Sequence, residues 1–81
     1  MLYINYYFKN IEYNDDYYKA EFYAPDNDVR CRFSYNRKTK EIDVFDSNKP
    51  VNEIMPLPIG WLDLKLKEKG HLDINEAKIS Y

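Results

Sequence analysis

Two side chains in this sequence could in principle form a nucleophilic pair: Cys31 and His71, the single cysteine and the single histidine of the chain. A cysteine becomes a strong nucleophile when a neighbouring histidine takes its proton and leaves a thiolate. Cys31, however, belongs to an apolar set of alternating residues, which predicts a buried thiol that behaves as a small apolar side chain. His71 follows Gly70 in a predicted loop. We therefore expect no catalytic dyad and no enzyme activity.

Carboxylates are grouped at Asp15-Asp16 and at Asp26-Asn27-Asp28. Such oxygen donors bind hard cations, but a calcium loop supplies about six oxygens and usually a glycine at its sharp turn. Aspartate and asparagine are also common in turns, because their side chains bond the nearby backbone. The turn interpretation accounts for both groups, and we expect neither a metal site nor a cofactor. With only Gly60 and Gly70 present, glycine-rich phosphate loops are excluded too.

Cations crowd into the segment Arg30–Lys40, together with Phe33 and Tyr35. Aromatic and cationic side chains that reach the same ligand are typical of nucleic-acid-binding surfaces. Here the alternation places Phe33 and Tyr35 on the side opposite Arg30 and Arg32, and the whole chain carries a net charge of −2. Nucleic-acid binding through this segment is therefore the alternative function rather than the first one.

A period-two alternation runs through residues 17–45, interrupted by turn-forming residues at 25–28 and 37–40. If Ala24 pairs with Val29 and Asn36 with Glu41, every apolar residue of the three segments falls on one face, which a one-residue slip would destroy. The pattern predicts a three-stranded antiparallel meander. Its inward set is Tyr18, Ala20, Phe22, Ala24, Val29, Cys31, Phe33, Tyr35, Ile42 and Val44.

The flanking segments extend this sheet. Residues 2–13 alternate as a first strand, and Asn10 changes the phase as a β-bulge does. Residues 59–69 lack β-branching after Ile59 and end before Gly70, which favours a helix, although Leu62, Leu64 and Leu66 also alternate like a strand. Residues 72–81 fit either a short helix opened by a capping box of Asp73 and Glu76, or a closing strand.

The predicted fold is a single small α+β domain spanning residues 1–81. It comprises an antiparallel β-meander of about four strands (about 2–46), a linker (about 47–58) and a helical C-terminal part (about 59–81). We expect the helix to pack on one face of the sheet through Leu62 and Leu66. Trp61 is expected to anchor this part to the sheet.

The face opposite the core carries the candidate contact residues. Tyrosine and arginine are enriched among interface hot spots, because each buries a large area and keeps a polar group for the partner. Glu21 and Phe45 are each expected to face Arg32, as an ion pair and a cation–π contact. A partner strand pairing with the edge at residues 41–45 is a second mode of binding. The predicted partner-binding set is Tyr17, Tyr23, Arg30, Arg32 and Phe45. Tyr3 and Tyr7 would extend this set if the first strand lies beside the second.

These features predict a non-catalytic protein-binding module. Its small size, and a composition that AT-rich codons favour, suggest a phage- or mobile-element-type inhibitor or adaptor acting on a larger bacterial protein. The alternative is a small nucleic-acid-binding β-domain. No signal peptide or membrane span is recognisable, so we expect a cytoplasmic protein without a membrane partner. The composition also permits a homo-oligomer.

Overall fold

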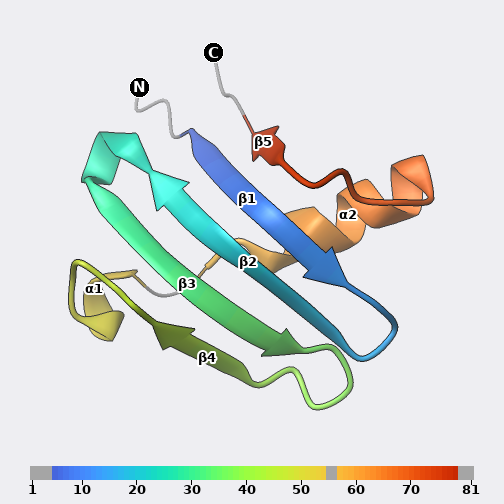
Figure 1. The fold of residues 1–81 in the computed structure, drawn as a ribbon, viewed down its shortest axis with the longest axis horizontal. Coiled ribbons are helices and arrows are strands. Elements are labelled where there is room, and N and C mark those ends of the chain that lie inside the picture. Colours follow the sequence, from blue (N-terminus) through green and yellow to red (C-terminus); the bar gives the residue numbers. More distant parts are fainter. Residues whose placement is uncertain (1–4, 55–56, 79–81) are drawn as a thin grey trace.

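The computed structural model describes residues 5–54 and 57–78 and shows an α+β fold built on an antiparallel sheet (Figure 1). The sheet has five strands in the order β4-β3-β2-β1-β5, so β4 and β5 lie at opposite edges. In chain order the elements are β1 (Tyr6–Tyr13), β2 (Tyr17–Ala24), the 3-10 turn η1 (Pro25–Asn27), β3 (Val29–Asn36), β4 (Ile42–Phe45), α1 (Val51–Ile54), α2 (Ile59–Lys69) and β5 (Glu76–Lys78).

Strands β2, β3 and β4 pair in the predicted register. Ala24 lies opposite Val29, and the pairing continues without a shift to Tyr17. Between β3 and β4, Phe33 lies opposite Val44, and the N–H of Asn36 donates to the carbonyl of Glu41 at 2.8 Å. The meander prediction is therefore confirmed residue by residue.

A bulge in β1 lets an even-numbered and an odd-numbered residue of the same strand both point into the core. The register between β1 and β2 shifts between Lys9 and Glu12, and Asn10 adopts a left-handed backbone with φ of 54°. Because one extra residue is accommodated there, both Phe8 and Ile11 are buried. The predicted bulge is confirmed. The part of the expected strand at residues 2–4 lies outside the described residues.

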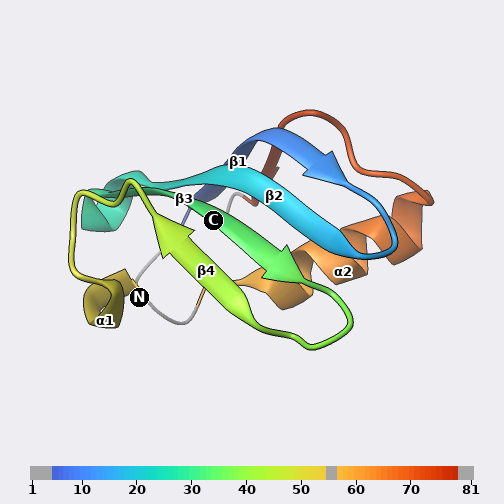
Figure 2. The same ribbon diagram turned by 60° about the horizontal axis from the view of Figure 1, so that its bottom comes forward.

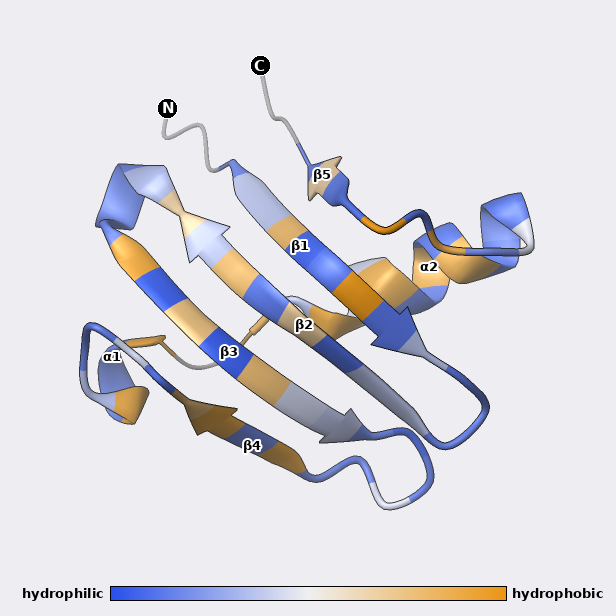
Figure 3. Cartoon of the chain, viewed as in Figure 1, coloured by the Kyte–Doolittle hydropathy of each residue, from blue (hydrophilic) through white to orange (hydrophobic). Residues whose placement is uncertain are grey.

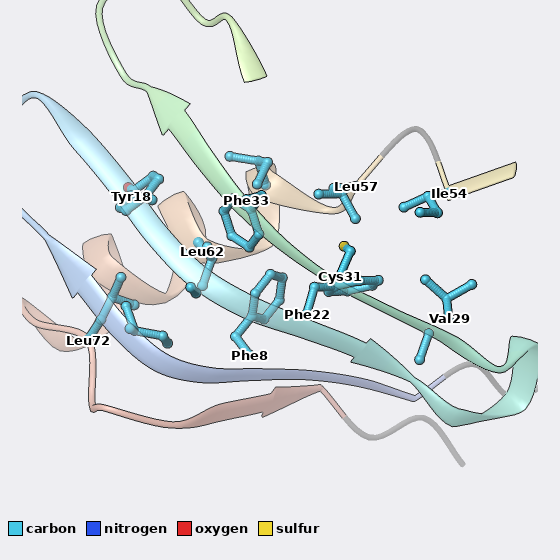
Figure 4. Packing of buried hydrophobic residues seen from close by; sticks show 14 residues of the cluster. Phe8, Tyr18, Phe22, Val29, Cys31, Phe33, Ile54, Leu57, Leu62 and Leu72 are labelled. Carbon is cyan, nitrogen blue, oxygen red and sulfur yellow. The ribbon is translucent and has the colours of Figure 1, made fainter. Parts of the chain in front are cut away.

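The core lies between the inner face of the sheet and the helical segments (Figure 4). Leu62 of α2 is completely buried, and Leu66 packs against the same cluster. Trp61 stacks on Phe8 with ring centroids 5.8 Å apart and planes 9° from parallel. The helical interpretation of residues 59–69 and the anchoring role of Trp61 are both confirmed.

Polar contacts fix the C-terminal end and the middle of α2. Gly70 ends the helix with φ of 78°, and its N–H donates to the carbonyl of Leu66 at 2.8 Å. In the middle, the hydroxyl of Tyr18, which has no exposed surface, donates to the Asp63 carboxylate. Burial, reinforced by this hydrogen bond, raises the pKa of Tyr18 well above its ordinary value. The sheet thus holds α2 by a directional bond as well as by apolar packing.

Residues 70–78 differ from the expected helix, which ends at Lys69 instead of continuing toward residue 81. The Glu76 carboxylate does accept from the N–H of Asp73, at 2.7 Å, but the chain then enters β5 beside β1. The reason is that strand β1 needs backbone partners on its outer side: the N–H of Ile11 donates to the carbonyl of Ile74 at 2.8 Å. The closing-strand alternative is the one observed.

Lys69 fastens this returning segment. Its ammonium lies 2.8 Å from Asp73 and 2.6 Å from Glu76, and these hydrogen bonds raise the pKa of Lys69, the bond to Asp73 most strongly. The bond to Lys69 in turn lowers the pKa of Asp73.

The linker expected at about residues 47–58 also differs from the prediction. Its residues 51–54 form the short helix α1, which places Ile54 in the core.

Candidate functional site

One face of the sheet is left uncovered by the described residues. Both helices lie on the same side of the sheet (Figure 2), and their buried residues all join the core cluster. Along β2 and β3, hydrophobic and hydrophilic residues alternate as bands of colour (Figure 3). The hydrophilic set faces away from the core, so the side chains of this outer face are free to meet a partner.

Register brings side chains of the outer face together in rows across the strands. Directly opposed residues on one face of an antiparallel pair have Cβ atoms about 5 Å apart, close enough for their side chains to touch. Two adjacent rows contain most of the aromatic and cationic residues. The first row is Arg30, Tyr23 and Tyr7, and the second is Phe45, Arg32, Glu21 and Lys9.

Four of the five predicted contact residues lie in these two rows: Tyr23, Arg30, Arg32 and Phe45. Both arginines and Phe45 are exposed, and Tyr23 is half-buried. Tyr17 lies on the same face but at the far end of β2, roughly 20 Å from Tyr23 along a strand that rises about 3.3 Å per residue. The structure therefore separates Tyr17 from the other four.

Arg32 has contacts on two sides. Its guanidinium carbon lies 5.8 Å from the centroid of the Phe45 ring, as expected, and its Nη1 lies 3.5 Å from the carboxylate of Asp46. The expected partner, Glu21, lies opposite in register but accepts a hydrogen bond from the side-chain amide of Asn10. Exposed ion pairs of this kind contribute only about 0–1 kcal/mol, so Arg32 can exchange Asp46 for a partner group at little cost.

Two residues of β1 complete the surface. The Tyr7 ring lies 6.1 Å from that of Tyr23, and the Lys9 ammonium lies 5.8 Å from the Tyr23 centroid. Tyr7 was an expected extension of the surface, whereas Lys9 was missed because its contribution depends on how β1 pairs with β2. Tyr3, the other expected extension, lies outside the described residues. We call Tyr7, Lys9, Tyr23, Arg30, Arg32 and Phe45 the outer patch.

The outer patch borders two shallow hollows. The larger, of about 490 Å³, lies around Tyr23 and Arg30; the smaller, of about 300 Å³, lies around Phe45 and Lys19. Both are also lined by Glu21 and Arg32, so the hollows adjoin along this central pair. Open hollows with several charged side chains are typical of contact surfaces rather than of enclosed substrate pockets.

Cys31, the candidate nucleophile, is not exposed on the outer face. The Cys31 side chain points into the core among the buried residues (Figure 4) and is 4% exposed. Burial raises the pKa of the Cys31 thiol to about 11, which keeps the thiol protonated at neutral pH. His71 lies in the loop after α2, where its Nε2 is 3.2 Å from the Asp73 carboxylate. The structure gives the two residues separate surroundings, as expected.

The basic segment Arg30–Lys40 does not form one surface. The Arg37 guanidinium donates to the carbonyl of Asn14 at 2.6 Å and lies 4.7 Å from the centroid of the Tyr18 ring. Lys38 pairs with Asp16 at 3.0 Å. Phe33 is buried, so it is unable to stack on a base. Of this segment, Arg30 and Arg32 are the cations that share a face with exposed aromatic rings.

Both aspartate groups lie in turns. In the first, the Asn14 side chain accepts from the N–H groups of Asp16 and Tyr17. In the second, Asp28 adopts φ of 51° and its N–H donates to the carbonyl of Pro25 at 3.2 Å. Within residues 5–54 and 57–78, no three histidine, cysteine or acidic side chains are grouped as metal ligands would be. In the same part of the chain, no helix has the length and apolar character needed to cross a membrane.

Strand β4 is an edge strand and pairs with β3 alone in the described sheet. It comprises four residues, with the acidic Asp43 within it and the acidic Glu41 directly before it. Charged side chains on a short edge strand oppose pairing with further strands. Strand addition is therefore less well supported here than contact through the outer face.

The chain matches no protein-family model, no curated protein and no solved structure.

Proposed function

We propose that this protein is a non-catalytic protein-binding module whose contact surface is the outer patch. The observation that carries the proposal is an uncovered sheet face on which Tyr7 and Tyr23, two arginines and Phe45 lie in adjacent rows. In its concrete form, the protein is a phage- or mobile-element-type inhibitor or adaptor of a larger bacterial protein, acting in the cytoplasm. The small size and composition of the chain support that form.

The energetics of the outer patch suit binding. Phe45 is 44% exposed, and burying the exposed part of such a ring against a partner stabilises a complex through the hydrophobic effect. The tyrosines and Phe45 stand on paired strands whose backbone is already ordered, and each of these side chains has only two main torsion angles to fix on association. Arg32 supplies a guanidinium beside an aromatic ring, a combination common at interface hot spots.

The test is a capture experiment with matched variants. The tagged protein is incubated with nuclease-treated lysate of its native host, and bound proteins are identified by mass spectrometry. The double variant Arg32→Ala/Phe45→Ala should lose the specific partner, because it removes the central contact of the outer patch. Lys67→Ala, at an exposed position on α2, should retain the partner.

Circular dichroism and thermal melts establish that both variants are folded before capture. If the double variant, folded, retains every partner of the parent protein, the outer patch is not the contact surface. If Lys67→Ala loses the same partner, binding occurs through the helical side.

Nucleic-acid binding is the second candidate, favoured by one observation: Arg30 and Arg32 share a face with Tyr23 and Phe45. The carboxylates of Glu12, Glu21 and Asp43 stand on the same face and oppose a phosphate chain. Anisotropy of a labelled oligothymidylate at several salt concentrations tests this candidate. Two neutralised phosphates would give a slope of log K against log salt of about −1.4 for a single strand.

A further inference from the structure

In the larger hollow of the outer face, the acidic side chains are bonded to neighbours, whereas two of the cations are not paired with a carboxylate of the described residues. It is lined by Lys9, Arg30 and Arg32 and by the acidic Glu21 and Asp46. Both carboxylates are engaged, since Asp46 pairs with Arg32 and Glu21 accepts from Asn10. In the part of the chain that the structure describes, the side chains of Lys9 and Arg30 have no carboxylate partner.

These two cations stand on either side of one aromatic ring. Arg30 is directly opposite Tyr23 in the β2–β3 register. Lys9 approaches from β1, with its ammonium 5.8 Å from the Tyr23 centroid. Tyr23 is half-buried and is itself supported by the Tyr7 ring. A carboxylate placed between the two cations would gain charge-assisted hydrogen bonds beside an apolar ring, where such bonds are stronger than in open water.

We propose that this hollow binds a carboxylate of an acidic segment of the partner protein. An aspartate or glutamate of that segment lies between Lys9 and Arg30, with its aliphatic part against the Tyr23 ring. This inference rests on the proposed function and specifies the chemistry of the partner.

An acidic peptide fits this surface better than a nucleic acid does. A single carboxylate that reaches Lys9 and Arg30 meets only the acidic side chains of the hollow itself, Glu21 and Asp46. Both are already bonded, Glu21 to Asn10 and Asp46 to Arg32. A longer phosphate chain on this face would also meet Asp43 and Glu12, which lie in the next row with Ser34 and Lys19.

The experiment is an NMR titration of the 15N-labelled protein with a capped peptide of Glu-Ser repeats. The control ligand is the same peptide with glutamine in place of glutamate. The glutamate peptide should shift the amide signals of Lys9, Tyr23 and Arg30, and the glutamine peptide should leave them in place. Lys9→Gln and Arg30→Gln should each weaken binding about tenfold or more, which is typical of a lost charged hydrogen bond.

Lys19→Gln is the matched control variant. Lys19 lies on the same face, but its ammonium is 4.6 Å from the Tyr17 ring and it lines the smaller hollow. Removing it changes the total charge as much as either test variant does. Binding should therefore be unchanged within about twofold, and an equal loss would show general charge attraction and overturn the proposal.

Two further results would overturn it. One is the absence of shifts at these amides with the glutamate peptide at up to about 5 mM. The other is a stronger response of the same amides to an oligothymidylate, which would assign the hollow to phosphate. A partner that is captured by the parent protein and lost from Arg32→Ala/Phe45→Ala, without any response to the acidic peptide, would leave the proposed function standing and remove this inference alone.

Discussion

The hydrogen bond from Tyr18 to Asp63 gives the sharpest test of how the sheet holds α2. Tyr18→Phe removes only the hydroxyl from a ring that is completely buried. A hydrogen bond to a charged group contributes about 1.5–3 kcal/mol, and Asp63 is exposed, which places this bond at the low end. We expect a loss of about 1.5 kcal/mol in the free energy of unfolding, or roughly 6–12 °C in Tm for a chain of this size.

The assay is urea unfolding followed by circular dichroism, with linear extrapolation to water. The set comprises Tyr18→Phe, Asp63→Ala and their combination. Asp63→Ala leaves the buried hydroxyl without its partner, at a cost of about 1–3 kcal/mol. In the double variant that hydroxyl is gone, so its loss of stability should be about 1.5 kcal/mol smaller than the sum of the two single losses.

Tyr35→Phe is the control, because the Tyr35 ring stacks on Tyr18 with centroids 6.1 Å apart. Tyr35 is half-buried, and loss of its hydroxyl should change stability by no more than about 0.5 kcal/mol. Additive effects of Tyr18→Phe and Asp63→Ala would refute the reasoning, since two groups that bond to each other must be coupled.

The burial of the Tyr18 hydroxyl, reinforced by this bond, predicts that stability depends on alkaline pH. The pKa of Tyr18 is raised in the folded state from 10.0 in the unfolded chain, mainly by burial, so the folded state holds the hydroxyl proton more tightly. This contribution is complete below pH 10 and is lost as the pH rises toward the folded pKa. Tyr18→Phe should therefore flatten the fall of stability above pH 10, and an unchanged profile would contradict this cause.

Three other outcomes follow from burial and backbone geometry. Phe33→Ala should cost about 3–5 kcal/mol in urea unfolding, whereas Arg32→Ala should stay within about 0.5 kcal/mol; the reverse order would mean that the two faces were exchanged. The buried Cys31 thiol, with its pKa raised from 9.0 to about 11 by burial, should resist iodoacetamide at pH 8 until urea unfolds the chain; rapid native labelling would show an accessible thiol. Lys40 adopts φ of 65°, so Lys40→Gly should raise stability by about 0.5–1 kcal/mol, while Lys40→Ala, which keeps the strained backbone, should not.

The sequence predicted the central sheet because two independent signals agreed there. The period-two pattern set which residues of β2 and β3 face inward, and the turn residues set where pairing begins, so Ala24 opposite Val29 determined the rest. Strand β5 carries no such signal. Its residues, Glu76 to Lys78, are mostly polar, and it is held by backbone pairing to β1 rather than by an apolar face.

The candidate site was predictable to the level of a face but not to the level of contacts. The period-two alternation along the strands predicted that Tyr23, Arg30, Arg32 and Phe45 point outward, as observed. The partners of long side chains are decided by rotamers and by neighbouring loops: Arg32 pairs with Asp46, which follows β4. The contribution of Lys9 likewise required the pairing of β1 with β2, which composition and alternation do not determine.

The described part of β5 is attached to the sheet more weakly than the inner strands are. Within residues 5–54 and 57–78, three residue pairs join β5 to β1, whereas eight join β2 to β3. Segments with few backbone bonds and exposed residues detach at lower free energy than the whole chain unfolds. Amide exchange should therefore be fast for Ala77 and Lys78 and slow through the middle of β2 and β3. The sheet's inner strands would then persist as one cooperative unit while its C-terminal margin opens and recloses.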